Sequence, residues 1–109
     1  MDIRGKRLVL IGGAGLIGSH TLDQLAKEDV EEIVVYDNFS RGRWENIQSA
    51  SRDPRVRIVE GDILHTDVLQ SVLDRADGVF HFAALWLLHC HEFPRSAFEV
   101  NIRGTFNVI

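Results

Sequence analysis

Cysteine is nearly absent from this chain, which limits how the chain can be stabilised and where it can work. Of its 109 residues only Cys90 is a cysteine, so no disulfide can form within the chain. A reducing compartment is therefore expected, because disulfides are typical of oxidising ones. Repeats, low-complexity tracts and linkers are also lacking, and 45% of the residues are hydrophobic, as in ordinary globular domains. We expect one domain, residues 1–109.

An excess of positive charge is lacking as well. The formal net charge of −4 gives no basic face for nucleic acid and no polybasic segment for an anionic membrane. Basic residues before position 8 precede an apolar run, as in a secretory signal, but Asp2 interrupts them and no small-residue cleavage pattern follows. The run is also too short to span a bilayer. We expect a cytoplasmic protein with no nucleic-acid or membrane partner.

Four apolar segments have the composition of β-strands. Residues 8–11 and 33–36 are continuously apolar, as expected of parallel strands that are covered on both faces. In residues 56–59, Arg57 interrupts the run and Arg55 flanks it, which favours a charged edge strand. Residues 79–84, "VFHFAA", are the fourth segment.

Helical patterns alternate with these strands. One helix follows the glycines and buries Leu22 and Leu25 on one face. A short helix is expected at 44–51, a third helix has an apolar stripe over 68–76, and a last one begins near Pro94. Residues 89–92, "HCHE", are expected to form a polar loop rather than a zinc site. The order β-α-β-α-β-α-β-α predicts an α/β fold with a doubly wound parallel sheet.

The stretch "LIGGAGLIGSH", residues 10–20, follows the first strand with the spacing Gly12-x-x-Gly15-x-x-Gly18. Gly12 permits a tight turn, Gly15 lets the backbone approach a pyrophosphate, and Gly18 lets the helix pack closely. The first helical turn, which includes Leu16 and Ile17, offers unpaired N–H groups and a partial positive charge to phosphates. This turn is one residue wider at its start than the usual dinucleotide fingerprint.

An acidic residue follows the second strand. Asp37 lies 19 residues after Gly18, where a carboxylate reaches the adenosine ribose hydroxyls of a dinucleotide. The alternative is a surface turn residue beside Asn38. A carboxylate repels a 2′-phosphate, which favours NAD, although Arg41 and Arg43 offer charges that suit NADP. The strand, the glycine turn and Asp37 together predict a dinucleotide site.

Five motifs, in order, resemble the extended short-chain dehydrogenase/reductases, specifically the NAD-dependent nucleotide-sugar epimerases and dehydratases. They are "GGAGLIGSH", "VVYDNFSRG", "EGDI", "VFHFAAL" and "VNIRGTFNVI". The resemblance implies a Rossmann-like sheet with strand order 3-2-1-4. It also implies that residues 1–109 are a partial NAD-binding domain, truncated after four β-α units, so a fragment of a longer enzyme is expected.

The same resemblance implies further cofactor contacts. Asp62 and Ile63 would meet the adenine, and the segment of Phe82, Ala83 and Ala84 would border the pyrophosphate and nicotinamide ribose. Without the family, these are a strand-to-loop turn and a packed strand end. Asn101 would equally serve as a core amide bonded to backbone. The full set of expected cofactor-binding residues is Gly12, Gly15, Leu16, Ile17, Gly18, Asp37, Asn38, Arg41, Gly42, Asp62, Ile63, Phe82, Ala83, Ala84 and Asn101.

The family's catalytic Tyr-x-x-x-Lys pair is missing. Tyr36, within the second strand, is the only tyrosine, and the lysines stand at positions 6 and 27. The chain alone is therefore expected to lack turnover. The leading function is the NAD-binding half of a nucleotide-sugar epimerase or dehydratase, with a nucleotide-sugar substrate in the full-length enzyme. The alternatives are a non-catalytic NAD(P)-binding or sensing module and a structural interaction domain.

The last helix and the fourth strand predict self-association. The fourth strand carries few of the charges that protect sheet edges. The helix has two apolar stripes, but packing on the sheet buries only one face. In the family this helix lies in the dimer interface, so a homodimer or larger species is expected. The stripes are Phe98, Ile102, Phe106 and Ile109, and Ala97, Gly104 and Val108.

Overall fold

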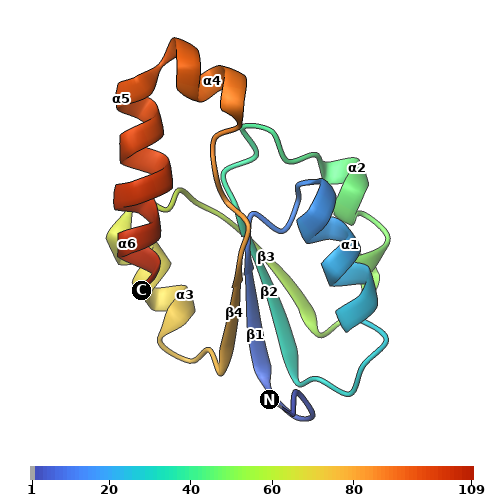
Figure 1. Ribbon diagram of the computed structural model, residues 1–109. Helices are drawn as coiled ribbons and strands as arrows, with labels where there is room; N and C mark the ends of the chain where they lie inside the picture. The colour runs from blue at the N-terminus through green and yellow to red at the C-terminus, as the bar shows by residue number, and fades with distance from the viewer. Residues whose placement is uncertain (1) are drawn as a thin grey trace.

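The computed structural model describes residues 2–109 and contains a four-stranded parallel sheet in the order β3-β2-β1-β4 (Figure 1). The predicted order 3-2-1-4 is confirmed. The strands are β1 (Arg7–Ile11), β2 (Glu32–Asp37), β3 (Val56–Glu60) and β4 (Gly78–His81).

The central strand β1 explains why the first apolar run has no polar residues. β1 pairs with β2 through Leu10 opposite Val35, and with β4 through Leu10 opposite Phe80. Leu8 and Leu10 pack into one hydrophobic cluster, whereas Val9 and Ile11 pack into another on the opposite face. Because alternate side chains of a strand point to opposite faces, a strand buried on both must be apolar throughout.

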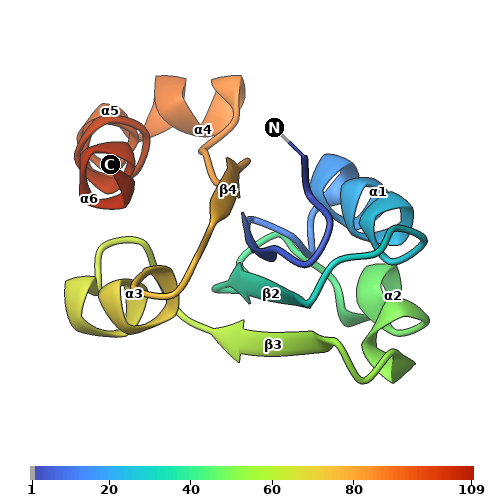
Figure 2. The same ribbon diagram turned by 90° about the horizontal axis from the view of Figure 1, so that it is seen from below.

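Helices cover both faces of the sheet (Figure 2). On one face lie α1 (Leu16–Leu25), α2 (Trp44–Ile47) and the short 3₁₀ helix η1 (Ala50–Arg52). On the other lie α3 (Thr66–Leu73) and the C-terminal helical segments. The change of face between the second and third crossovers makes the sheet doubly wound, as predicted.

The C-terminal helix is irregular. After α5 (Pro94–Ala97) the chain continues as a π-helical segment, η2 (Phe98–Gly104), and then as α6 (Thr105–Val108). Gly104 is buried there, and a Cβ at this position would overlap the Ile63 side chain. The Asn107 amide donates to the Ile63 carbonyl oxygen at 3.0 Å. The helix therefore rests on the segment that follows β3.

Three predictions of local structure were wrong. β4 ends at His81 rather than at residue 84, because its partner β1 turns away at Gly12, after the Ile11 carbonyl oxygen has accepted the Phe82 N–H at 2.7 Å. The predicted helix at 44–51 breaks into α2 and η1. Residues 89–92 belong to a helix, α4 (Leu87–Glu92), instead of a polar loop. Phe93 separates α4 from α5 because the residue before a proline disfavours helical backbone.

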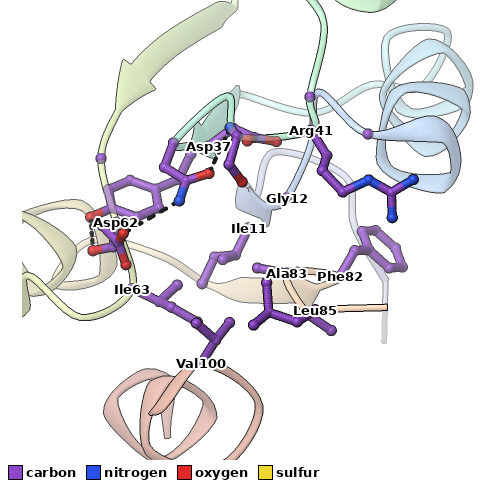
Figure 3. Close-up of a pocket in the computed structure, with 17 residues that line it drawn as sticks. Ile11, Gly12, Asp37, Arg41, Asp62, Ile63, Phe82, Ala83, Leu85 and Val100 are labelled. Atoms are coloured by element: carbon purple, nitrogen blue, oxygen red, sulfur yellow. Dashed lines mark hydrogen bonds between the residues drawn. The ribbon is translucent and has the colours of Figure 1, made fainter. Parts of the chain in front are cut away.

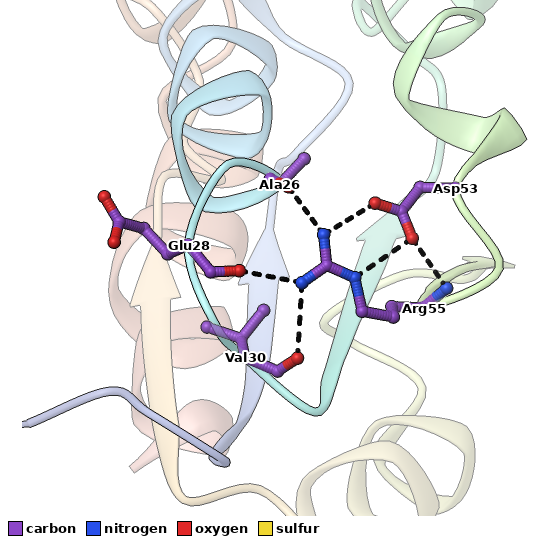
Figure 4. Close-up of polar contacts among 5 residues, drawn as sticks. All are labelled: Ala26, Glu28, Val30, Asp53 and Arg55. Carbon is purple, nitrogen blue, oxygen red and sulfur yellow. Dashed lines mark hydrogen bonds and ion pairs between the residues drawn. The ribbon is translucent and has the colours of Figure 1, made fainter.

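Arg55, expected to protect a sheet edge, instead caps the end of α1 (Figure 4). Its guanidinium donates to the carbonyl oxygens of Ala26 at 2.5 Å and Glu28 at 2.7 Å. It also pairs with Asp53 at 2.7 Å, and this hydrogen bond lowers the pKa of Asp53. The last turn of α1 has no basic residue of its own, so Arg55 supplies the cation that a helix C-terminus favours.

Replacing Arg55 by alanine should lower the midpoint of thermal unfolding by about 4 °C or more, because the carbonyl groups beyond α1 lose their donors. Arg57→Ala is the matched control, since Arg57 lies 4.0 Å from Glu32 in an exposed pair that contributes little. Circular dichroism melts of both variants check the expectation. Equal melting temperatures for the two variants would contradict it.

Candidate functional site

A cavity of about 140 Å³ opens where the carboxyl ends of the strands meet. Figure 3 shows Asp62 and Ile63 at one end of the view, Phe82 and Arg41 at the other, and Gly12 between them. In open α/β sheets, ligands bind at this edge. The residues that line the cavity are Ile11, Gly12, Gly15, Tyr36, Asp37, Asn38, Ser40, Arg41, Gly42, Gly61, Asp62, Ile63, Phe82, Ala83, Ala84, Leu85 and Val100.

Most of the residues predicted for the cofactor site line this cavity. Gly12, Gly15, Asp37, Asn38, Arg41, Gly42, Asp62, Ile63, Phe82, Ala83 and Ala84 are among them. Leu16, Ile17 and Gly18 begin helix α1 beside it, and Asn101 lies in the C-terminal helix. Sequence reasoning did not single out six further lining residues, although the quoted motifs contain all of them, because no charge or turn spacing distinguishes them. They are Ile11, Tyr36, Ser40, Gly61, Leu85 and Val100.

The three glycines of the turn have different reasons to be glycine. Gly12 has φ +82°, and a Cβ there would lie 2.8 Å from the Ala83 nitrogen. At Gly18 a Cβ would overlap the carbonyl oxygen of Gly12, so α1 packs against the turn itself. At Gly15 a Cβ would meet only the Gly12 carbonyl oxygen, at 3.5 Å. The protein's own packing therefore leaves room for a side chain at Gly15, on the wall of the cavity.

Asp37 joins two loops at the floor of the site. The residue is only 8% exposed, so it is not the surface turn residue of the alternative interpretation. Oδ2 accepts the Ala14 N–H at 3.0 Å, and Oδ1 accepts the Phe39 N–H at 2.8 Å. Phe39 has φ +58°, a conformation that this hydrogen bond helps to hold. A carboxylate oxygen can accept more than one hydrogen bond, so Asp37 retains acceptor capacity toward a ligand.

A second acidic residue, Asp62, stands where β3 has ended. Oδ1 accepts the Leu64 N–H at 2.9 Å, and Oδ2 accepts the Asn38 amide at 3.3 Å. The Tyr36 hydroxyl donates to the Asp62 carbonyl oxygen at 2.7 Å. Burial, and secondarily the Asp62 charge, raises the pKa of Tyr36. Tyr36 is therefore a protonated wall group that fixes the Asp62 backbone.

Asn101 acts on the backbone beyond β4. Its Oδ1 accepts the Leu85 N–H at 2.7 Å, and its Nδ2 donates to the Leu85 carbonyl oxygen at 3.1 Å. Nδ2 also lies 3.4 Å from Cys90 Sγ. Asn101 is thus the backbone-bonded amide of the alternative interpretation, and it is not among the cavity's lining residues. Through Leu85, which does line the cavity, Asn101 fixes one wall.

Arg41 spans toward the segment after β4. Its guanidinium carbon lies 4.6 Å from the centroid of the Trp86 ring, within the range of a cation–π contact. Asp37, four residues before Arg41, points instead at the glycine turn, where it accepts the Ala14 N–H. The end of β2 thus presents a carboxylate to the glycine turn, and the loop after it presents a cation to an aromatic ring.

Other parts of the described chain offer less chemistry. Residues 2–109 contain no group of three or more His, Cys, Asp or Glu side chains arranged to hold a metal ion. No helix within the same residues is long and apolar enough to cross a membrane. A second cavity, of about 180 Å³, is lined by three arginines, but Arg7 pairs with Glu31 at 3.1 Å and Arg57 lies 4.0 Å from Glu32.

Comparison with known proteins identifies the family of this chain. A profile of the 3-beta hydroxysteroid dehydrogenase/isomerase family matches residues 9–109. The chain belongs to this family. UDP-glucuronic acid decarboxylase 1 of Arabidopsis thaliana is 33% identical over 104 residues, and UDP-glucose 4-epimerase of Lacticaseibacillus casei is 34% identical over 105. The alignments cover 94% of this chain in both cases, but only 22% and 30% of those relatives.

A solved structure shares the fold of this chain. The Bordetella bronchiseptica enzyme WbmF, in complex with NAD+, matches with a TM-score of 0.88 and 27% sequence identity. The match covers 99% of this chain and 32% of WbmF. The predicted resemblance to nucleotide-sugar epimerases and dehydratases is confirmed at the level of the family, and the chain corresponds to under a third of the relatives' length.

A half-buried histidine joins β4 to the C-terminal helix. His81, the last residue of β4, shares a hydrogen bond of 2.9 Å between Nε2 and Thr105 Oγ1 of α6. Its Nδ1 is buried and has no hydrogen-bond partner. Burial lowers the pKa of His81 below its ordinary value of 6.5. The imidazole is therefore neutral at pH 7 and helps to join β4 to the C-terminal helix.

Acid should weaken the fold partly through His81. Because its pKa is lower in the folded chain, the unfolded chain binds this proton more readily, and the free energy of unfolding falls as pH drops through 6.5. Urea unfolding at pH 7.5 and 5.5 should show a smaller loss in His81→Gln, which keeps a donor near the Nε2 position. His20→Gln, on α1, is the control. An identical pH dependence in His81→Gln and the unsubstituted chain would contradict the expectation.

Proposed function

We propose that this chain binds NAD and forms the cofactor-binding part of a nucleotide-sugar epimerase or dehydratase. The observation that carries the proposal is the meeting of the glycine turn and the Asp37 carboxylate in one cavity at the carboxyl edge of the sheet. The pattern is that of a dinucleotide site, where pyrophosphate approaches backbone and an acidic residue meets the ribose. The NAD+ complex of the similar enzyme WbmF supports it.

The residues present suit the parts of NAD. Gly15 and the first-turn amides of α1 suit the pyrophosphate, because the cavity lies against Gly15 and nothing in the protein fills the space of its missing Cβ beyond van der Waals contact. Asp37 suits the adenosine ribose diol. Asp62 and Ile63 suit the adenine, since an acceptor and a buried apolar side chain lie together there.

The far end of the cavity suits the nicotinamide half. Phe82, Ala83 and Ala84 have left the strand, and the two alanines leave space beside the backbone. NAD bound there would supply a hydride acceptor and donor for a sugar carbon in the full-length enzyme. The nucleotide-sugar substrate is inferred from the names of the relatives, which act on UDP-glucose and UDP-glucuronic acid.

NAD should be preferred over NADP. The Asp37 carboxylate accepts hydrogen bonds from a ribose diol but repels a 2′-phosphate. Arg41 is a cation that could pair with that 2′-phosphate, but its guanidinium lies against the Trp86 ring. Withdrawing it would cost the cation–π contact, so the nearest charge that favours NADP is already engaged.

Asp37→Ala should weaken NAD binding roughly 10- to 150-fold, or about 1.5–3 kcal/mol, because a charge-assisted hydrogen bond is lost. NADP should lose little or bind better. Asp37→Asn keeps an acceptor for Phe39 and separates the charge from the turn geometry. Asp23→Asn, an equal change of charge at an exposed position of α1, is the control. Calorimetric titration with both nucleotides is the measurement, and equal weakening of the two would refute the assignment.

A second candidate is a non-catalytic NAD(P)-binding or sensing module. It is favoured by the position of Tyr36, the only tyrosine of the 109 residues, in the cavity wall, where its hydroxyl bonds to the Asp62 carbonyl oxygen. A coding sequence that continues past Ile109 into Tyr-x-x-x-Lys would favour the enzyme. We infer a cytoplasmic location for either function, supported by the single cysteine.

We further infer that the chain forms a homodimer or larger species through the C-terminal helix, β4, or both. Gly104 is buried against the body of the protein. Of the two apolar stripes on this helix, the one that does not contain Gly104 faces outward. Its members Phe98, Ile102, Phe106 and Ile109 are 54% to 97% exposed. Burying four such side chains would contribute roughly 6–12 kcal/mol before the cost of association, which is enough for micromolar affinity.

Phe98→Glu combined with Ile102→Glu should convert the associated species to a monomer that remains folded, because both side chains are more than half exposed. Sedimentation velocity across a concentration series, with circular dichroism as the check on folding, measures the result. Val68→Glu, at an exposed position of α3, is the control and should leave association unchanged. A monodisperse, folded monomer of the unsubstituted chain at high concentration would show the proposal wrong.

A further inference from the structure

The peptide groups on both sides of Ala14, in the glycine turn, are held by Asp37 at the end of β2 and by residues that follow β2. Ala14 is fully buried, and its N–H donates to Asp37 Oδ2 at 3.0 Å. Its carbonyl oxygen accepts two hydrogen bonds, from the Arg43 N–H at 3.1 Å and from Asn46 Nδ2 at 2.9 Å. Hydrogen bonds therefore hold the turn at both the N–H and the carbonyl oxygen of Ala14. The Asn46 side chain supplies one of the two donors to that carbonyl oxygen.

Asn46 is well placed to orient this carbonyl. It lies in α2, which Ile47, with 0% exposure, anchors in the hydrophobic core. Its own N–H bonds to the Arg43 carbonyl oxygen at 3.0 Å. At Gly42 a Cβ would lie 2.8 Å from Ala14 Cβ, so the loop before α2 is packed against the turn. The Asn46 amide thus reaches the turn from a fixed support.

The Ala14 carbonyl and the Gly15 N–H belong to the same planar peptide group. A donor that fixes the direction of the carbonyl therefore also fixes the direction of the Gly15 N–H, which bonds to the Gly12 carbonyl oxygen at 3.3 Å. Gly15 lines the cavity and precedes the first turn of α1. The orientation of this one peptide decides how the backbone faces the space that a pyrophosphate would occupy.

We propose that Asn46 is a positioning residue for the cofactor site, acting through the Ala14–Gly15 peptide to hold the glycine turn in the form that accepts a pyrophosphate. This rests on the proposed function. Asn46 is outside the set of residues that line the cavity, so it acts on a ligand through the turn. It should matter for ligands that contain the pyrophosphate and not for the nucleoside alone.

Removing the Asn46 donor should selectively weaken binding of ligands with a pyrophosphate. Asn46→Ala and the volume-matched Asn46→Leu should raise the Kd for NAD and for ADP-ribose roughly 3- to 10-fold, the loss of one hydrogen bond. The Kd for adenosine should change less than about twofold, as detected by NMR titration. Asn46→His should restore binding, because imidazole Nδ1 occupies the position of the asparagine amide and the site is exposed enough for a ring.

The same variants have a readout without any ligand. Loss of the Asn46 donor should speed hydrogen exchange of the Gly15 amide, which shares a peptide group with the Ala14 carbonyl and bonds to the Gly12 carbonyl oxygen at 3.3 Å, and Asn46→His should restore its protection. Arg55→Ala, which weakens the fold at the opposite edge of the sheet, is the control and should leave both the NAD-to-adenosine ratio and the local exchange unchanged, once global stability is accounted for.

The outcomes separate the two proposals. If the unsubstituted chain fails to bind NAD, the proposed function falls, and the exchange of the Gly15 amide still decides whether Asn46 positions the turn. If NAD binds and Asn46→Ala changes neither the NAD-to-adenosine ratio nor the exchange of the Gly15 amide, the positioning role is overturned. An equal loss for NAD and adenosine would also overturn it, because that result indicates a general structural role.

Discussion

The carboxylate of Asp37 is the interaction on which the arrangement of this site depends. It ends the second strand and accepts hydrogen bonds from Ala14 in the glycine turn and from Phe39 in the next loop. Two connections that leave neighbouring strands are thus tied to one buried charge. Because the charge is satisfied by backbone donors, burial at the sheet edge is tolerated, and the same oxygens remain directed at the cavity.

Much of the fold was predictable because it follows from burial. A strand such as residues 8–11 that is covered on both faces must be apolar throughout, and its sequence shows this directly. Gly12 and Gly18 were predictable for a similar reason, since close approach of backbone leaves no room for a side chain. Asp37 could be located by its distance from the glycines, because the length of one β-α-β unit fixes where the second strand ends.

Other features depend on contacts between distant residues, which no local pattern records. Arg55 has the sequence context of an edge charge, yet it caps a helix whose last turn precedes it by about thirty residues. Asn101 was assigned to the cofactor, but its amide is consumed by the backbone of Leu85. The end of β4 is set by where β1 turns away, so it could not be read from "VFHFAA" alone.

The same dependence on distant contacts explains the missed role of Asn46. Its context, "RWEN", indicates only a short helix, and the partner carbonyl of Ala14 lies 32 positions earlier. When a polar side chain bonds to the backbone of a distant residue, the local sequence around it does not indicate which residue that is. A glycine motif therefore identifies a turn in the sequence. The groups that support the turn can be identified only from the folded structure, which brings the supporting loop next to it.

The π-helical segment η2 has a consequence for how this helix can change in evolution. Such a segment accommodates one more residue than a regular helical turn, and so rotates everything after it relative to everything before. Asn101 within the segment and Asn107 after it both reach backbone on the body of the protein, at Leu85 and Ile63. A single-residue deletion between them would restore regular winding and turn one of the two amides toward solvent. The helix therefore tolerates exchange of side chains more readily than any change in its length.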